Sequence, residues 1–337
     1  MITPPIHRTR KWITRAAVAA LCCGHLSAAS IPDPDSYVLE RTVGYQVESP
    51  PRRVEWKAPE PIQTNLTVYS ASIPPFDRAL MQRVADHFQV RGDIKQFTDR
   101  DTSAFGYLIE ERNPTNRMTV RDVAYIATTG AFRYSTADRG DRWDIKNHKP
   151  LVHGVPDKVE AKEIAVKLFP LLGISTNDLH HRPDGRLFAS YGEEGVTYNE
   201  RVTMERKRVV IQRSVSFYQK IPGGEAVSSV GDGGQVRFTF VSDGKVAGIE
   251  WFFRKLEQAG LAKSKSRQEL IKDIKAGRCW TWHQKVPRYL TVTNCELAYP
   301  QGNSGTYQPY VWPFYMVTGT GEEGRPVTLF VSAKWRD

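Results

Sequence analysis

The densest group of side chains that could bind a metal is a histidine pair with two carboxylates nearby. His180 and His181 are adjacent in the sequence, and Asp178 and Asp184 lie on either side of them. Imidazole nitrogens and carboxylate oxygens are both ligands of zinc. Adjacent side chains point in different directions unless a turn brings them together, so we interpret this segment as a solvated loop. The sequence therefore predicts no metal site and no cofactor.

A second segment, residues 229–234, has the composition of a phosphate-binding loop, with glycines at positions 231, 233 and 234. Phosphate loops lie between a strand and a helix, because the helix N-terminus contacts the anion. This segment lies between two alternating stretches, so we interpret it as a turn between strands. The common hydrolase, redox and nucleotide-binding motifs are absent from the sequence. We predict no catalytic residue, although an enzyme that uses a pair of carboxylates would leave no such motif.

The candidate binding face consists of Arg213, Trp251 and Phe253. Arg213 lies between Ile211 and Val215, at a position where the alternation predicts an apolar side chain. A buried guanidinium needs an acid or carbonyl groups as partners, so one interpretation is a structural ion pair. The other is contact with an anion or a C-terminus in a groove. Trp251 and Phe253 either line a ligand-binding face or pack under a covering element.

Two cysteines, Cys279 and Cys295, remain after the N-terminal region is set aside. An even number of cysteines in an oxidising compartment permits one disulfide, so we predict a Cys279–Cys295 bond. The alternative is a pair of buried free thiols. A catalytic cysteine is disfavoured, because no cysteine–histidine signature surrounds either residue.

Residues 1–29 have the pattern of a secretory signal peptide. They contain four basic residues and no acid, followed by a short apolar stretch at 16–24 and small residues at 27–29. We therefore expect a secreted, periplasmic or otherwise extracytoplasmic mature chain with no integral membrane span. Cys23 raises the alternative of a lipid anchor, although the residues before it fit a lipidation motif poorly.

Four of the ten net positive charges lie in this N-terminal segment, and no nucleic-acid-binding motif is present. We therefore expect no nucleic-acid partner. A protein or an envelope polymer remains a candidate partner, and the sequence does not specify the oligomeric state.

The element around which the rest is arranged is a long alternating stretch at residues 208–219. Its odd positions are mostly apolar and its even positions are mostly polar, which is the pattern of a strand with one buried face. Two more alternating stretches follow at 236–240 and 249–253, joined by an Asp243-Gly244 hairpin signal. These segments predict a twisted antiparallel sheet.

Three segments have the periodicity or capping residues of helices, at 76–88, 156–173 and 266–277. Each is followed by strand-like segments. We therefore predict an α+β fold made of tandem modules, each with one helix packed on a twisted antiparallel sheet. The predicted organisation is a signal peptide, an extended Pro-rich lead-in, a first module and a second, larger module with a C-terminal hairpin, with boundaries at 1–29, 30–61, 62–150 and 151–337.

The order of these elements resembles PepSY-like domains. The similarity rests on residues 214–227, which lead into a Pro-Gly-Gly turn, on the Phe-Val-Ser-Asp-Gly-Lys-Val sequence at 240–246, and on Trp-Pro-Phe-Tyr at 312–315. It covers residues 155–337, and residues 62–135 by the order of elements. PepSY-like domains occur in protease propeptides and in extracytoplasmic regulators of sensor kinases, so the resemblance implies binding and regulation and supplies no catalytic residues. We expect a departure from the propeptide pattern, in which a protease domain follows the module.

These observations lead to one principal expectation of function and two alternatives. We expect a secreted, non-enzymatic protein that binds or regulates a protein or cell-envelope partner through a sheet face or edge. The first alternative is a secreted hydrolase that acts on an envelope polymer, for which two carboxylates with shifted pKa values in one cleft would be the evidence. The second is a structural component of the envelope.

Overall fold

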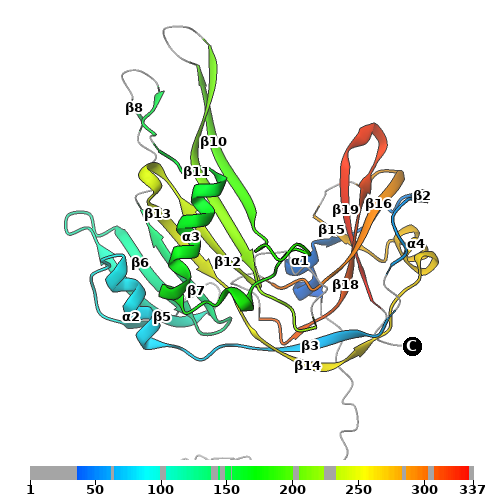
Figure 1. Ribbon diagram of the computed structural model, residues 1–337, viewed down its shortest axis with the longest axis horizontal. Coiled ribbons are helices and arrows are strands. Elements are labelled where there is room, and N and C mark those ends of the chain that lie inside the picture. The colour runs from blue at the N-terminus through cyan, green and yellow to red at the C-terminus, as the bar shows by residue number, and fades with distance from the viewer. Residues whose placement is uncertain are drawn as a thin grey trace, which may run out of the picture. The chain divides into compact units, whose positions relative to one another are not determined.

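The computed structural model describes most of the chain after residue 35. The described residues are 36–61, 64–98, 104–137, 143–144, 149–152, 154–199, 205–223, 233–282, 286–302 and 307–333. They belong to one compact unit, residues 33–337 (Figure 1). The expected signal peptide, Cys23 and positions 229–232 of the glycine-rich segment lie outside the described residues.

The largest sheet has eight antiparallel strands. The central part is the alternating region predicted from the sequence, including a hairpin in which Asp243 and Gly244 both have positive φ angles. In spatial order the strands are β10 (Ser190–Asn199), β11 (Arg206–Tyr218), β12 (Gln235–Phe240), β13 (Val246–Trp251), β7 (Ala131–Thr136), β6 (Thr119–Ile126), β5 (Phe105–Arg112) and β4 (Lys95–Thr98).

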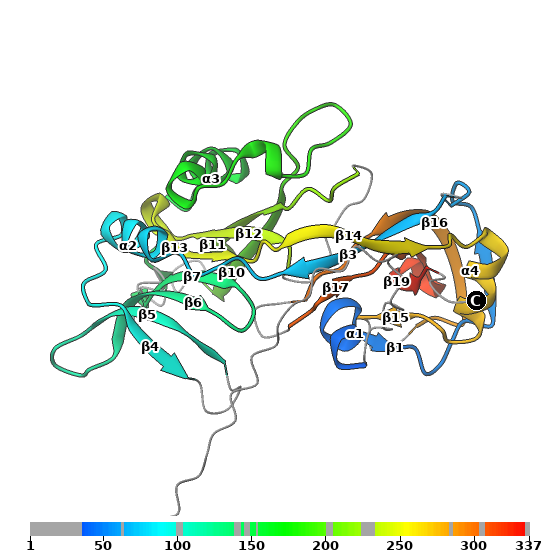
Figure 2. The same cartoon turned by 90° about the horizontal axis from the view of Figure 1, so that it is seen from below.

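Two helices, α2 (Arg78–His87) and α3 (Lys158–Leu172), lie on one side of this sheet (Figure 2). Both begin where the sequence supplies an N-cap: the Asp77 side chain accepts a hydrogen bond from a backbone N–H, and that of Asp157 accepts two. The α3 helix ends at Gly173, which adopts the left-handed conformation that favours glycine. The predicted helices at 76–88 and 156–173 are therefore confirmed.

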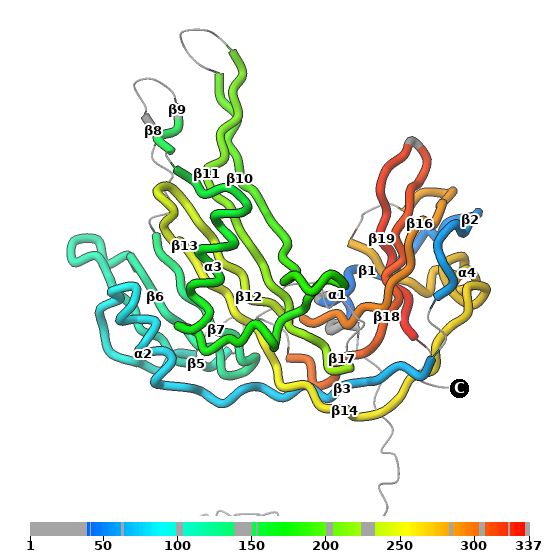
Figure 3. The backbone as a smooth tube through the Cα atoms, in the orientation of Figure 1, coloured from blue at the N-terminus to red at the C-terminus, as the bar shows by residue number. Residues whose placement is uncertain are grey.

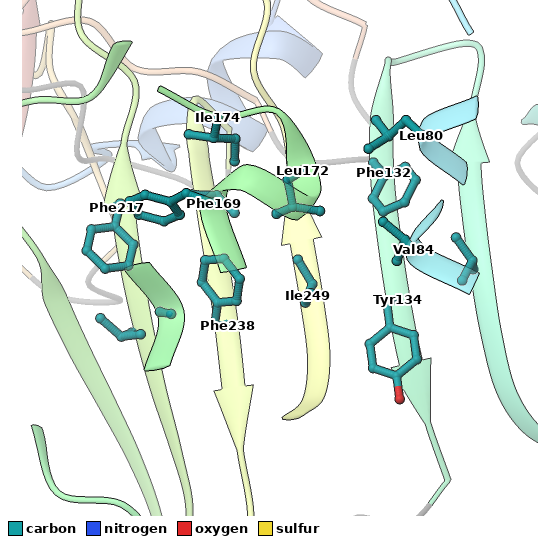
Figure 4. Close-up of a cluster of buried hydrophobic side chains, with 14 of the residues drawn as sticks. Leu80, Val84, Phe132, Tyr134, Phe169, Leu172, Ile174, Phe217, Phe238 and Ile249 are labelled. Atoms are coloured by element: carbon teal, nitrogen blue, oxygen red, sulfur yellow. The ribbon is translucent and has the colours of Figure 1, made fainter. Parts of the chain in front are cut away.

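The main hydrophobic core lies between these helices and the sheet (Figure 4). Phe169 of α3 packs against Phe217 and Phe238, with ring centroids 4.9 Å and 6.0 Å away. The α2 helix contributes Leu80 and Val84, opposite the β7 side chains. Apolar side chains at alternate positions of β11 and β12 therefore share the face that the helices cover, as the alternation predicts.

A second sheet has six strands and combines segments from both ends of the chain. Strand β2 pairs in parallel with β16, and the other pairs are antiparallel. In spatial order the strands are β1 (Tyr45–Gln46), β15 (Trp280–Thr281), β19 (Pro326–Ser332), β18 (Phe314–Thr320), β16 (Tyr289–Ala298) and β2 (Arg53–Trp56).

The remaining helices are α1 (Ser36–Val43), next to β1 in the sequence, and α4 (Arg267–Lys275). The predicted capping box at the start of α4 is present, because Ser266 and Glu269 each accept a hydrogen bond from the other's backbone N–H. Residues 36–61 thus contain a helix and two strands, where the sequence predicted an extended lead-in.

A three-stranded sheet, β14 (Lys255–Ala262), β3 (Leu66–Ser72) and β17 (Tyr310–Val311), pairs segments that are distant in the sequence. Figure 3 shows β3 and β14 running side by side. The hydrogen bond from Ser70 Oγ to the carbonyl of Glu257 joins residues 187 positions apart. A short hairpin, β8 (Trp143–Asp144) with β9 (Lys149–Pro150), completes the strands of the described residues.

The predicted fold class, tandem α+β modules of one helix on a sheet, is wrong. The chain is rich in strands, and its large sheets do not follow the expected modules. Strand β7 belongs to the expected first module and β13 to the second, yet they pair directly, with Trp251 opposite Phe132. The local periodicity of each segment predicts its type, whereas pairing between distant segments decides which sheet it joins.

The predicted disulfide is not formed, because Cys279 and Cys295 are both free. Cys279 immediately precedes β15, whereas Cys295 lies within β16, and strands β19 and β18 separate the two. Three strand spacings amount to about 14 Å, whereas the Cα atoms of a disulfide lie within about 7 Å. Burial of each thiol raises its pKa to about 12, so both remain protonated. The alternative of two free thiols agrees with this arrangement.

A polar open face on the eight-stranded sheet

The face of the eight-stranded sheet opposite α2 and α3 is polar. Because successive side chains of a strand alternate between faces, its residues are the neighbours of the core positions. Strand pairing aligns Ser216 of β11, Arg237 of β12, Glu250 of β13 and Arg133 of β7 in one row across four strands. We call this surface, together with the row described next, the open face.

A second row, of small residues, runs beside the charged one. Strand pairing aligns Ser214, Thr239, Gly248 and Ser135 across the same four strands. Short side chains in this row and long ones in the next leave a hollow of about 290 Å³ between them. The floor of the hollow is rich in hydroxyl groups and backbone, and its wall carries guanidinium and carboxylate groups.

The charged groups of the open face form two ion pairs. Arg133 Nη2 lies 2.8 Å from Asp122 Oδ2, and the Ser135 hydroxyl donates a hydrogen bond to the other oxygen of the same carboxylate. Arg237 Nη1 lies 3.4 Å from Glu250 Oε2, and its Nε donates a hydrogen bond to Ser216 Oγ at 3.3 Å.

These two ion pairs differ in their exposure to solvent. The Asp122 side chain is only 9% exposed, so its pair fixes the position of the Arg133 guanidinium, whose side chain is 49% exposed. Arg237 and Glu250 are 32% and 40% exposed. An ion pair that is this accessible to solvent contributes only about 0–1 kcal/mol to stability.

The three residues of the predicted binding face lie on the opposite, helix-covered side. The Arg213 guanidinium donates one hydrogen bond to the carbonyl of Pro156, at 2.7 Å, and another to the Glu193 carboxylate. Its side chain is only 11% exposed. Of the two interpretations of Arg213, the structural ion pair agrees with these contacts.

Trp251 and Phe253 pack against the main core and against each other, with ring centroids 5.9 Å apart. The Trp251 ring also lies 6.2 Å from that of Phe132. Phe253 reaches the edge of a different hollow of about 360 Å³, which is also lined by Arg254. The structure therefore does not bring Trp251 and Phe253 together with Arg213 in one surface.

The histidine pair forms part of a short turn that packs beside β11. The His180 N–H donates to the carbonyl of Tyr218, and its ring lies 5.5 Å from that of Phe188. His181 Nδ1 lies 2.9 Å from the carbonyl of Leu179. Burial, together with the neighbouring His181, lowers the pKa of His180 below its usual range. Among the described residues, no group of three or more histidine, cysteine, aspartate or glutamate side chains has the geometry of a metal site.

Two carboxyl groups with shifted pKa values in one cleft would be evidence for a hydrolase. Two backbone N–H groups at the start of α3 lower the pKa of Asp157, and the hydrogen bond and charge of Lys255 lower that of Glu257. Both are surface groups outside the 290 Å³ hollow, and each has a structural partner.

The residues of the open face were not selected from the sequence. The polar even positions of β11 indicated a second, wet face, but Arg237, Glu250 and Arg133 come from three other strands. Only the register of these strands places them in one row. Alternation within β12 and β13 is the signal that would have assigned Arg237 and Glu250 to the wet face.

Comparisons with known proteins do not name a family. No protein-family model and no curated protein matches the chain. Among solved structures, the chain is similar to an uncharacterized protein from Eubacterium rectale, with 11% identity and a TM-score of 0.41. The match covers 82% of this chain and 85% of the other. A likeness at this level supports no conclusion about fold or function. In the described part of the chain, no helix is long and apolar enough to cross a membrane.

Proposed function

We propose that the chain is an extracytoplasmic, non-enzymatic protein that binds a protein partner through the open face. The observation that carries this proposal is the row Ser216–Arg237–Glu250–Arg133, which lies in register beside a row of small residues. The first row supplies charge and the second leaves room for a partner's side chains.

The charges of the open face favour a protein over a polyanion. Two guanidiniums, Arg133 and Arg237, are paired with two carboxylates, Asp122 and Glu250, so these four groups carry no net charge. A polyanion would be repelled by the carboxylates, whereas a protein surface offers both signs of charge together with amide groups. Complementary charges of this kind determine specificity and register at protein interfaces.

The resemblance to PepSY-like domains supports the same proposal, because it implies binding and regulation without catalytic residues. The matched residues 214–227 include Ser216 of the open face, and Arg237 lies within the wider region, 155–337, that the resemblance covers. Regulation of a protease or a sensor kinase is therefore the role that we propose for the interaction. The expected signal peptide supports a location outside the cytoplasm for the protein and its partner.

Gly248 provides the sharpest test, because it lies in the floor of the hollow and tolerates a side chain. A Cβ atom there would meet the carbonyl oxygen of Tyr134 at 3.5 Å and Thr239 Cβ at 3.8 Å, which are ordinary van der Waals contacts. Gly248→Tyr should therefore fold and fill the hollow, whereas Gly248→Ala should leave most of it open. Both variants remove the same glycine, so they differ mainly in how much of the hollow the new side chain fills.

The experiment is affinity capture of envelope proteins from the native organism with the chain and both variants, followed by mass spectrometry and a binding titration with the purified partner. We expect wild type and Gly248→Ala to bind one protein equally well, and Gly248→Tyr to bind it at least tenfold more weakly. Equal binding by all three proteins would place the interface elsewhere. Retention of glycan alone would contradict a protein partner.

A further inference from the structure

A larger hollow lies beside the six-stranded sheet, away from the open face. Its volume is about 750 Å³, and its lining includes Tyr45, Glu48, Arg52, Thr281 and Arg288. Ligand-binding pockets in proteins commonly have volumes of about 300–1,000 Å³. The hollow is therefore large enough for a small organic ligand.

The fold builds this hollow from a segment that connects the two edges of the sheet. Strands β1 and β2 are the first and last strands in the spatial order, so residues 47–52 connect one edge with the other. Backbone hydrogen bonds hold both ends of this segment. The Val47 N–H donates to the Cys279 carbonyl at 3.0 Å, and the Arg52 N–H donates to the Arg288 carbonyl at 2.8 Å. The backbone of Gly277 also packs closely against Val47, since a Cβ atom at Gly277 would lie 2.9 Å from the Val47 carbonyl oxygen. The wall of the hollow is thus held in place before any ligand arrives.

Two arginines face this hollow without an acidic partner in the described part of the chain. The Arg288 carbonyl accepts hydrogen bonds from the N–H groups of both Arg52 and Arg53, so the backbones of Arg52 and Arg288 are directly linked. Arg52 and Arg288 are exposed, and neither takes part in an ion pair within the described residues. Glu48 is the one carboxylate among the described lining residues, so the lining carries a net positive charge.

Two guanidiniums in the lining of one hollow attract an oxyanion. The planar guanidinium forms paired hydrogen bonds with carboxylate and phosphate groups, and this geometry makes arginine the preferred residue at such sites. Tyr45, which is 62% exposed, adds a flat apolar surface elsewhere in the lining of the hollow. A ligand that combines an oxyanion with a ring matches both features.

We propose that this hollow binds a sugar that carries a carboxylate or a phosphate, with its anionic group held by Arg52 and Arg288 and its ring against Tyr45. Charged groups of this kind occur on envelope polymers, which the mature chain would meet outside the cytoplasm. The site is separate from the open face, so its occupancy does not depend on the proposed protein partner.

The test is isothermal titration of the mature chain with glucuronate, glucose 6-phosphate and neutral glucose. We expect one or both anionic sugars to bind and glucose to bind at least tenfold more weakly. Which anionic sugar binds more tightly decides between carboxylate and phosphate. Affinity should also fall as salt is raised from 50 to 500 mM, because screening weakens the charge attraction.

Two variants locate the site. The double change Arg52→Gln with Arg288→Gln should weaken binding at least tenfold, while Arg53→Gln is the matched control. Arg53 is exposed and adjacent to Arg52 in the sequence, but it is not among the residues that line the hollow. Circular dichroism should show that both variants are folded, and Arg52→Lys provides a milder change if the double variant is not. Unchanged affinity in the double variant, equal loss in Arg53→Gln, or equal binding of glucose would each overturn the proposal.

Discussion

Replacing Phe217 by alanine should destabilise the protein strongly, and the structure gives the size of the effect. The Phe217 side chain has no exposed surface. Its ring lies 4.9 Å from that of Phe169 and 6.3 Å from that of Phe238, both in edge-to-face arrangements. Strand β11 is paired on both sides, by β10 and β12, so the backbone cannot easily move to close a cavity.

The expected loss is about 3–5 kcal/mol, which is the range for truncating a buried phenylalanine. The edge-to-face contacts contribute about 0.5–1.5 kcal/mol each beyond the buried area, which places the expectation in the upper half of that range. Phe217→Leu should cost less, since it leaves a smaller cavity. Phe105, which is 37% exposed, supplies a control in Phe105→Ala.

The assay is urea unfolding followed by circular dichroism, with the mid-point and slope measured for each variant. A loss below about 1 kcal/mol for Phe217→Ala, or a loss no larger than that of Phe105→Ala, would refute the assignment of β11 to the core. If Phe217→Ala is too unstable to purify, Phe217→Leu provides the comparison.

Three further predictions address the cysteines, the Arg213 ion pair and the histidine turn. Ellman's reagent at pH 8 should label Cys279 and Cys295 slowly in the folded chain and both rapidly in denaturant without reductant, because burial raises each thiol pKa to about 12; failure to label in denaturant would indicate a disulfide. Arg213→Ala should cost about 1–3 kcal/mol in urea unfolding, because it leaves the Pro156 carbonyl and the Glu193 carboxylate without this donor; adding Glu193→Ala should cost less than the sum of the single changes. The folded pKa of His180 is lower than its ordinary 6.5, so the unfolded chain takes up a proton first and stability should fall as the pH drops below 6.5. His180→Gln should reduce this fall between pH 7.5 and 5.5, and an identical fall in the variant would contradict the assignment.

Local patterns in the sequence predicted the individual elements well where one face is buried. The alternation in β11 correctly assigned Val215 and Phe217 to the core, and the capping residues correctly placed the start of α4. Arg213 shows what the alternation cannot predict. Its position on the buried face was clear, but its partner Glu193 lies on β10, and the strand register alone identifies it.

The parts that could not be predicted depend on pairing between distant segments. Strand β1 has two residues and β2 has four, too few for a period to be recognised. The open face likewise depends on strand register, since α3, β10 and β11 all lie between Arg133 and Arg237 in the sequence. The hollow beside the six-stranded sheet depends on Arg52 and Arg288 meeting through backbone hydrogen bonds.

The pairing of both N-terminal strands with the C-terminal sheet determines the order in which the chain can fold. Strands β1 and β2 are synthesised first, but their partners β15 and β16 begin only at Trp280 and Tyr289. Contacts between segments so far apart slow folding, because a long loop must close before they form. The six-stranded sheet therefore cannot acquire its edges until nearly the whole chain has emerged. A chain that is still incomplete keeps its early strands unpaired, and unpaired strands are prone to aggregation.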